Sequence, residues 1–216
     1  MNIIVLGAPG AGKGTQAEKI HEKLQIPHIA SGDLFRIAVE QGTELGALAK
    51  EYMEKGKLVP DEVVAKMVFQ RLSENDCNSG WVLEGFPRNN NQAKTLENYL
   101  TEVDKVIDKV IFIDVPEDEL VRRLSGRLIC RNCQSPYHAV MAPPKVPGKC
   151  DKCGGELYQR TDDREGVVRE RLTTYRDITE PTLQYYKDES KLIVVDGNQE
   201  IGKVTQAVLS SIEDCK

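Results

Sequence analysis

Nine residues near the N-terminus, GAPGAGKGT at positions 7–15, restrict the possible folds of this 216-residue chain more than any other segment. They directly follow an apolar run, NIIVLG at 2–7, and open a helical pattern. Gly7, Gly12 and Lys13 fit the G-x-x-x-x-G-K spacing of a phosphate-binding loop. Glycine lets backbone N–H groups approach phosphate oxygens, and a helix N-terminus with a lysine adds positive charge. The segment therefore predicts a strand–loop–helix unit that binds nucleotide phosphates.

Apolar runs typical of buried strands alternate with helical periodicity along the rest of the chain. This alternation predicts a parallel sheet with right-handed crossovers and helices on both faces. The predicted strands cover 2–7, 26–30, 80–86, 108–115 and 191–197. The predicted helices cover 14–24, 31–41, 43–55, 61–74, 89–99, 117–126, 163–188 and 200–213. The expected fold class is α/β, with a five-stranded parallel sheet of the P-loop NTPase type.

Two segments interrupt the alternation and look like insertions into the sheet domain. Residues 30–59 hold two successive helices with no strand between them, and 128–158 hold cysteines, prolines and little helical pattern. Insertions at the carboxyl ends of strands are where open α/β sheets bind ligands. The expected division is a core domain of 1–29, 60–126 and 164–216, a first insert of 30–59 and a second insert of 127–163.

The charge and composition of the chain disfavour a nucleic-acid-binding protein. The net charge is −5 and aromatic residues make up 6% of the chain, whereas nucleic-acid binding favours basic and aromatic surfaces. Any anionic ligand must therefore meet a local cluster of arginine and lysine. There is no apolar run long enough for a membrane span, and the N-terminus lacks the basic region of a signal peptide. We expect a cytoplasmic protein without nucleic-acid or membrane partners.

Four of the six cysteines form two Cys-x-x-Cys pairs: Cys130, Cys133, Cys150 and Cys153. Their spacing matches a zinc ribbon, and four thiolates would make a closed, structural site with one zinc per chain. Two disulfides, a redox pair or iron are alternatives, and His138 could replace one ligand. The other two cysteines are expected to be free thiols without a role: Cys77 and Cys215.

Five further motifs resemble those of the adenylate kinases, a family of nucleoside monophosphate kinases. They are SGDLFR (31–36), KGKLVP (55–60), EGFPRNNNQ (84–92), VRRLSGR (121–127) and RTDDREGVVRER (160–171). The resemblance extends from Met1 to about Gly197, and the cysteine segment is similar to the long-lid form. It implies a monomeric enzyme that reversibly transfers a phosphoryl group from Mg²⁺-bound ATP to AMP, giving two ADP. The first insert would bind the monophosphate and the second would be a zinc-binding lid.

Direct transfer between two anionic nucleotides needs alignment and positive charge rather than a protein nucleophile. By resemblance, the catalytic residues are Lys13, Arg88, Arg123, Arg127, Arg160 and Arg171. The implied ATP site is formed by Gly10, Ala11, Gly12, Lys13, Gly14, Thr15, Arg123, Arg127, Pro136, Tyr137 and Gln199. The implied AMP site is formed by Ser31, Arg36, Lys57, Leu58, Val59, Gly85, Phe86, Pro87, Arg88, Gln92, Arg160 and Arg171. Within it, Gln92 would contact the adenine edge.

Acidic residues near these motifs admit more than one interpretation. The family usually has Asp before GFPR, whereas this chain has Glu84; with Asp33 it is a candidate for the Mg²⁺ water shell. Asp162, with Glu165, fits first a capping box for the helix 163–188. The resemblance adds a second role, in which Asp162 and Asp163 orient lid arginines.

The segment VRRLSGR at 121–127 marks the entrance to the lid, and two other functions remain as alternatives. Arg123 and Arg127 would share a helix face if the helix 117–126 extends that far, and the Ser-Gly between them suits a hinge. One alternative function is a kinase for another monophosphate, namely CMP, UMP or GMP. The other is a zinc-ribbon ATPase that binds nucleic acid.

Overall fold

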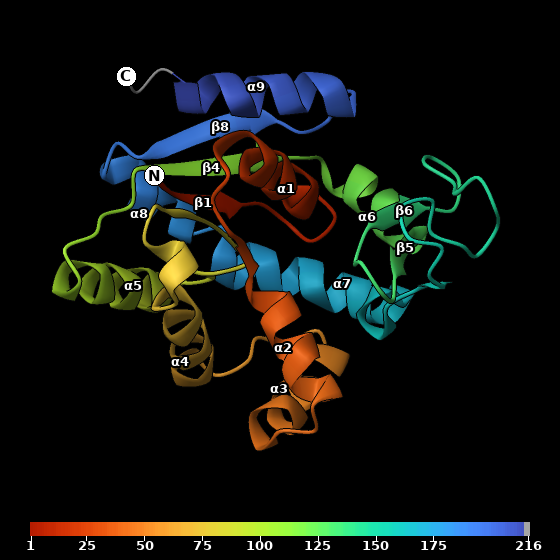
Figure 1. The fold of residues 1–216 in the computed structure, drawn as a ribbon, viewed down its shortest axis with the longest axis horizontal. Helices are drawn as coiled ribbons and strands as arrows, with labels where there is room; N and C mark the ends of the chain where they lie inside the picture. The colour runs from red at the N-terminus through yellow and green to blue at the C-terminus, as the bar shows by residue number, and fades with distance from the viewer. Residues whose placement is uncertain (214–216) are drawn as a thin grey trace.

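The structure, a computed structural model, describes residues 1–213, except for the side chain of Glu165. Its central sheet is five-stranded and parallel, with the order β2-β3-β1-β4-β8. These strands are Asn2–Leu6 (β1), His28–Ala30 (β2), Trp81–Glu84 (β3), Lys109–Asp114 (β4) and Leu192–Asp196 (β8). The predicted fold class and its five-stranded sheet are confirmed (Figure 1).

Helices cover both faces of the sheet, which is why the central strands are apolar throughout. Along β1, Ile4 and Leu6 belong to one core cluster, and Ile3 and Val5 belong to the other. The first cluster includes side chains of α4 (Asp61–Leu72) and α5 (Asn90–Glu102), and the second includes side chains of α1 (Lys13–Leu24) and α9 (Ile201–Glu213). The phosphate loop therefore starts from a strand that is packed on both sides.

The first insert consists of two helices, α2 (Ser31–Glu40) and α3 (Glu44–Glu54), which pack against each other. The turn between them is fixed by Thr43, whose hydroxyl accepts from Gly46 N at 3.0 Å and donates to Ala38 O at 3.1 Å. Gly46 is required there because a Cβ would lie 2.2 Å from Ala38 O. This compact pair projects away from the sheet (Figure 1).

The second insert follows α6 (Glu117–Ser125) and forms a small antiparallel sheet of three strands that the sequence pattern did not predict. The strands are Arg127–Cys130 (β5), Pro136–His138 (β6) and Leu157–Tyr158 (β7), in the order β6-β5-β7. Because α6 ends at Ser125, Arg123 lies on the helix while Arg127 begins β5. The expectation that these two arginines share a helix face is therefore wrong.

The single helix predicted over 163–188 is also wrong. This segment holds a 3₁₀ turn, Thr161–Asp163, then α7 (Glu165–Thr174), a π-helical turn, Tyr175–Thr179, and α8 (Thr182–Asp188). Pro181 precedes α8 and has no N–H to continue the α-helical ladder. A further 3₁₀ turn spans Asn75–Cys77. Within residues 1–213, none of the helices is both long enough and apolar enough to cross a bilayer.

Candidate active site

The phosphate loop, the first insert and the GFPR motif meet because each follows the carboxyl end of a neighbouring parallel strand. The loop follows β1, Ser31 follows β2, and Gly85 follows β3. The order β2-β3-β1 makes these strands direct neighbours, and such an edge is where open α/β sheets bind ligands. The topology therefore gathers motifs that are distant in the sequence.

Glycine conformation and a buried lysine define the phosphate loop. Gly10 and Gly12 have φ values of 88° and 94°, which residues with a side chain rarely adopt. Lys13 opens α1, and its Nζ donates to Ala8 O at 2.9 Å. Burial lowers the pKa of Lys13 to about 8, although the charge of Glu84 opposes this shift. Burial thus destabilises the charged form of the ammonium group, and an anionic ligand beside it would stabilise that form.

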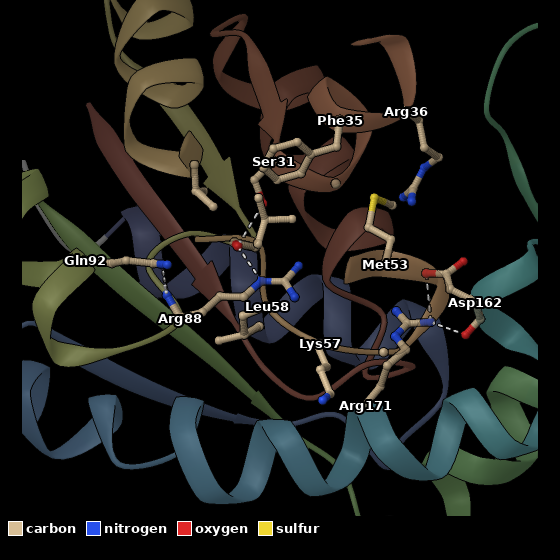
Figure 2. Close-up of a pocket in the computed structure, with 15 residues that line it drawn as sticks. Ser31, Phe35, Arg36, Met53, Lys57, Leu58, Arg88, Gln92, Asp162 and Arg171 are labelled. Atoms are coloured by element: carbon tan, nitrogen blue, oxygen red, sulfur yellow. Dashed lines mark hydrogen bonds and ion pairs between the residues drawn. The ribbon is translucent and has the colours of Figure 1, made fainter. Parts of the chain in front are cut away.

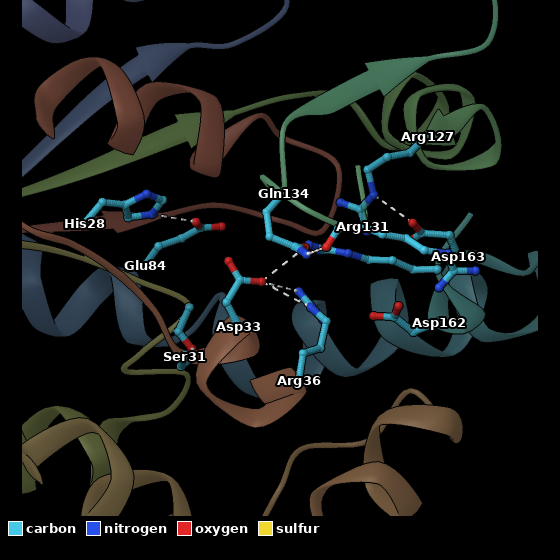
Figure 3. Close-up of polar contacts among 12 residues, drawn as sticks. His28, Ser31, Asp33, Arg36, Glu84, Arg127, Arg131, Gln134, Asp162 and Asp163 are labelled. Atoms are coloured by element: carbon cyan, nitrogen blue, oxygen red, sulfur yellow. Dashed lines mark hydrogen bonds and ion pairs between the residues drawn. The ribbon is translucent and has the colours of Figure 1, made fainter. Parts of the chain in front are cut away.

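Gly14 occupies the position where the phosphate-loop pattern usually has serine or threonine. The side chain of Glu84 explains why a glycine is needed there. A Cβ on Gly14 would lie 3.2 Å from Glu84 Oε2, so the carboxylate of β3 occupies this space. His28 Nε2 is 3.2 Å from the same oxygen (Figure 3). Burial alone would raise the pKa of Glu84, but the hydrogen bond from His28 and the charge of Lys13 lower it to about 2. Glu84 is therefore an ionised carboxylate beside the phosphate loop.

A pocket lies between the first insert and the core, beside GFPR (Figure 2). Its wall is held together at Gly85, whose carbonyl accepts from Ser31 Oγ at 2.8 Å and from Arg88 Nε at 2.7 Å. Gly85 has a φ of 77° and leaves room for Ser31. The residues that line the pocket are Ser31, Gly32, Phe35, Arg36, Met53, Gly56, Lys57, Leu58, Val59, Val64, Gly85, Arg88, Gln92, Asp162 and Arg171.

Arginines from β5, α2 and α7, and one just before the 3₁₀ turn Thr161–Asp163, surround the space between the loop and the pocket. Arg127 Nε donates to Asp163 Oδ2 at 2.7 Å, and Arg171 Nη1 lies 3.0 Å from Asp163 Oδ1 and 3.1 Å from Asp162 Oδ2. In a second group, Asp33 Oδ1 pairs with Arg36 at 3.0 Å (Figure 3) and with Arg160 at 3.4 Å. The carboxylates thus fix arginines of the lid, the first insert and α7.

The positive charges in this cluster oppose one another. Burial and then the charge of Arg171 lower the pKa of Arg88 to about 10. Burial and then the charges of Arg36 and Arg127 lower the pKa of Arg160 to about 10. Cations held this close in a partly dehydrated site favour a polyanionic ligand, because phosphate oxygens would relieve their repulsion.

Asp162 corrects one sequence interpretation. It lies in the 3₁₀ turn before α7, and Arg164, not Asp162, occupies the N-cap position of that helix. Asp162 is 9% exposed and its carboxylate faces Arg171. The capping interpretation is therefore wrong, since the side chain pairs with an arginine instead. The side chain of Glu165, the other half of the predicted capping box, lies outside the described part of the chain.

Some predicted residues lie apart from this cluster. Arg123 donates to Glu119 Oε1 at 2.8 Å and to Gly197 O at 3.0 Å. Gln199 follows β8 and donates to Asp196 Oδ2 at 3.0 Å. Pro136 and Tyr137 lie on β6 of the lid. The sequence patterns did not single out His28, because its partner Glu84 is separated from it by 56 positions.

The four lid cysteines converge on one point. Their sulfur atoms all lie within 4.8 Å of one another, and the pairs Cys130–Cys153 and Cys133–Cys150 are each 3.5 Å apart. A tetrahedral zinc with bonds of about 2.3 Å needs sulfur atoms about 3.8 Å apart, so this donor set fits a metal. The Tyr137 hydroxyl, 3.4 Å from Cys150 Sγ, lowers the pKa of that thiol.

The other candidate ligand and the spare cysteines do not join this cluster. His138 Nδ1 accepts from Val140 N and Met141 N, and its Nε2 lies 3.2 Å from Arg122 O, at the root of the lid. Cys77 is a buried free thiol in the core, and Cys215 lies outside the described residues. The described cysteines are free thiols, which disagrees with the disulfide alternative.

A phosphate loop and a second anion pocket joined by shared arginines define a P-loop phosphotransferase that acts between two nucleotides. Comparison with known proteins identifies the family. A family model described as adenylate kinase matches residues 5–191. The adenylate kinase of Archaeoglobus fulgidus is 53% identical over 216 residues, which is 100% of both chains. That of Oceanobacillus iheyensis is 51% identical over 213 residues, 99% of both chains.

The adenylate kinase of Caldicellulosiruptor bescii is 50% identical over 212 residues, 98% of this chain and 99% of the relative. The chain belongs to the adenylate kinase family. It is a nucleoside monophosphate kinase whose reaction transfers a phosphoryl group between Mg²⁺-bound ATP and AMP. The expected family, enzyme class and activity are therefore confirmed.

Proposed function

We propose that the arginine cluster carries the family reaction in this chain, by stabilising a phosphoryl group that passes directly from ATP to AMP. The supporting observation is the convergence of Arg88, Arg127, Arg160 and Arg171 near Lys13, with lowered pKa values at Lys13, Arg88, Arg160 and Arg171. The oxygen atoms of a metaphosphate-like group would occupy a site where positive charge is already assembled.

The AMP side of the reaction is assigned to the pocket beside GFPR. Arg36 and Arg88 would hold the AMP phosphate, with Arg160 and Arg171 bridging toward the transferred group. Lys57, Leu58 and Val59 line the same pocket as Ser31, Gly85 and Gln92, which supports their predicted roles. Phe86 is fully buried in the first core cluster and, with Pro87, would fix the chain between Gly85 and Arg88.

The ATP side is assigned to the loop of residues 10–15 and to the lid. The loop would surround the β- and γ-phosphates, with Arg127 contacting them from β5. Arg123 and Gln199 lie near each other in the fold, since Arg123 donates to Gly197 O at 3.0 Å. With Pro136 and Tyr137 of β6, Gln199 would border the ATP base when the lid closes, and Arg123 would contact the ATP phosphates.

Two metals are assigned to two different tasks. Mg²⁺ bound with ATP supplies charge neutralisation at the phosphates, and Glu84 and Asp33 would orient its water shell. Zinc is assigned to the four lid cysteines, where a closed site gives stability rather than chemistry. Metal analysis of the purified protein distinguishes zinc from iron, and one zinc per chain is expected.

We further propose that both inserts move relative to the core of 1–29, 60–126 and 164–216. The first insert, 30–59, would close over AMP and the lid, 127–163, over ATP, which excludes water from the transferred group. The separate helix pair of the first insert and the separate three-stranded sheet of the lid support this division. We also propose a monomer in the cytoplasm, as the resemblance to the family implied.

The decisive experiment measures ADP formation from Mg-ATP with AMP, CMP, UMP or GMP as acceptor. Fast turnover with AMP, and little ATP hydrolysis without an acceptor, would support the proposal. Equal ATPase rates with and without AMP would contradict it. Adding DNA or RNA tests the nucleic-acid alternative, for which stimulated hydrolysis and a steep salt dependence are expected.

A further inference from the structure

The AMP pocket contains a group that suits recognition of a base edge. Among the described residues that line it, Gln92 alone has a side-chain amide, which offers a donor and an acceptor side by side. The other lining side chains are charged, apolar or, in Ser31, a hydroxyl that donates to Gly85 O. The orientation of the Gln92 amide therefore decides which hydrogen-bonding pattern the pocket presents.

Both ends of this amide contact partners of fixed polarity. Gln92 Oε1 accepts from Arg88 N at 2.7 Å (Figure 2). Gln92 Nε2 donates to Asp61 Oδ1 at 2.7 Å. A backbone N–H can only donate, and an ionised carboxylate can only accept. Rotating the amide by about 180° would oppose two donors at one end and two acceptors at the other. Since Gln92 is 1% exposed, water cannot compensate for that arrangement.

Asp61 is itself held in place as an acceptor. Its carboxylate accepts from Asn89 Nδ2 at 3.0 Å and from Asn91 Nδ2 at 3.0 Å, in addition to Gln92. Burial alone would raise the pKa of Asp61, but these hydrogen bonds from Asn91, Gln92 and Asn89 lower it. Asp61 is also the first residue of α4, where the helix dipole favours negative charge.

Asn89 secures the same arrangement from the side of α5. Its side-chain oxygen accepts from Gln92 N at 2.8 Å, so its amide nitrogen must face Asp61. The cap of α5 and the start of α4 thus share one carboxylate. As a result, the Gln92 side chain and the backbone that carries it are both fixed relative to Asp61.

We propose that Asp61 is a specificity-determining positioning residue, which fixes the polarity of the Gln92 amide and so selects a base with an amino group beside a ring acceptor. This inference rests on the proposed function, in which Gln92 contacts the base of the acceptor nucleotide. Gln92 keeps one lone pair on Oε1 and one N–H on Nε2 for that contact.

The selected pattern is that of adenine. The 6-amino group of adenine donates and its N1 accepts, which matches the free lone pair and N–H of Gln92. Hypoxanthine has the same ring size but the opposite pattern, with an acceptor at O6 and a donor at N1. A site built to pair with one pattern rejects the other because its buried polar groups are left unpaired. Cytosine shares the order of adenine, so this device does not exclude CMP.

The test compares AMP and IMP as acceptors by their kcat/KM values. In Asp61→Asn the new side-chain amide can donate or accept. If the Gln92 amide rotates, it then loses only the hydrogen bond from Arg88 N and keeps one to residue 61. We expect the preference for AMP over IMP to fall about tenfold, the effect of one net hydrogen bond. Glu62→Gln is the matched control. It removes a neighbouring exposed carboxylate from the same helix turn and should leave the preference unchanged.

Gln92→Ala separates failure of this inference from failure of the proposed base contact. If Gln92→Ala and Asp61→Asn both retain the AMP preference, Gln92 does not contact the base. If only Gln92→Ala loses the preference, the base contact stands and the role of Asp61 is overturned. Asp61→Ser, whose hydroxyl also donates or accepts, replaces Asp61→Asn should that variant not fold, with the same expectation.

Discussion

Asp163 joins Arg127 of the lid to Arg171 of α7. Its carboxylate accepts from Arg127 Nε at 2.7 Å through one oxygen and from Arg171 Nη1 at 3.0 Å through the other, and the side chain is fully buried. Desolvation alone would lower the pKa of Arg127, but the charge of Asp163 raises it. One buried anion therefore holds two cations that would otherwise repel each other.

Replacing Asp163 by Asn should impair catalysis, because Arg127 would lose the carboxylate it is paired with and Arg171 would keep only that of Asp162. We expect kcat to fall about 100-fold, in the range seen when a preorganised charge stabiliser is lost. Asp177→Asn, an exposed acid beside Arg176, is the matched control and should keep its activity. Steady-state kinetics with ATP and AMP checks this expectation, and near wild-type kcat in Asp163→Asn would contradict it.

Nucleotide binding should take up protons at mildly alkaline pH through Lys13. In the free protein its pKa is about 8, below its ordinary 10.5, so the group is partly neutral between these values. Phosphates favour the charged form, and binding must therefore add protons within this window and little below it. Titration calorimetry of ATP at pH 8.5 in two buffers of different ionisation enthalpy measures the uptake. Lys13→Arg, which stays charged, should show less of it.

Gly14→Ala should lower kcat/KM about tenfold, since the new Cβ would lie 3.2 Å from Glu84 Oε2 and displace the carboxylate. Glu84→Asp shortens that side chain by one methylene and creates room. We therefore expect the double variant to be more active than Gly14→Ala alone, with an altered Mg²⁺ requirement. Kinetics over a range of Mg²⁺ concentrations tests this, and simple additivity of the two losses would disagree with the steric explanation.

Removing metal from the four-cysteine cluster should loosen the lid while leaving the phosphate loop intact. The lid core includes few apolar side chains, chiefly Leu128, Leu157 and Tyr137, so metal ligation must provide much of its stability. Hydrogen exchange should rise in the lid, and thermal unfolding should begin several degrees lower. Cys77→Ala, a thiol of the main core, should retain full metal content. Metal-free, folded protein that binds ATP normally but has lost all turnover would contradict a bracing role.

The sequence predicted the parts of the molecule that depend on local patterns, in which the interacting residues are close together along the chain. The phosphate loop follows from the spacing of Gly7, Gly12 and Lys13, and the buried strands follow from continuous apolar runs. The break at Pro181 was missed because the flanking helical pattern outweighed a single residue. The lid strands are too short for periodicity to reveal.

Contacts between distant segments required the structure. Asp61 lies 31 positions from Gln92, and His28 lies 56 positions from Glu84, so no local pattern connects them. Asp162 shows the same limit, because its position before a helix indicated a cap, whereas its partner, Arg171, lies nine positions further along the chain, beyond the reach of a cap. The roles of Asp61, His28 and Asp162 therefore follow from hydrogen bonds and ion pairs between segments that only the fold brings together.

The carboxylate of Asp33, which belongs to the first insert, lies 3.0 Å from Arg36 of the same helix and 3.4 Å from Arg160 at the base of the lid. Movement at either place changes the environment of the same anion. By thermodynamic linkage, whatever influence one bound nucleotide has on the other through this contact must be equal in both directions. The sites proposed for the two nucleotides thus meet at one carboxylate, through which binding at one site would alter affinity at the other.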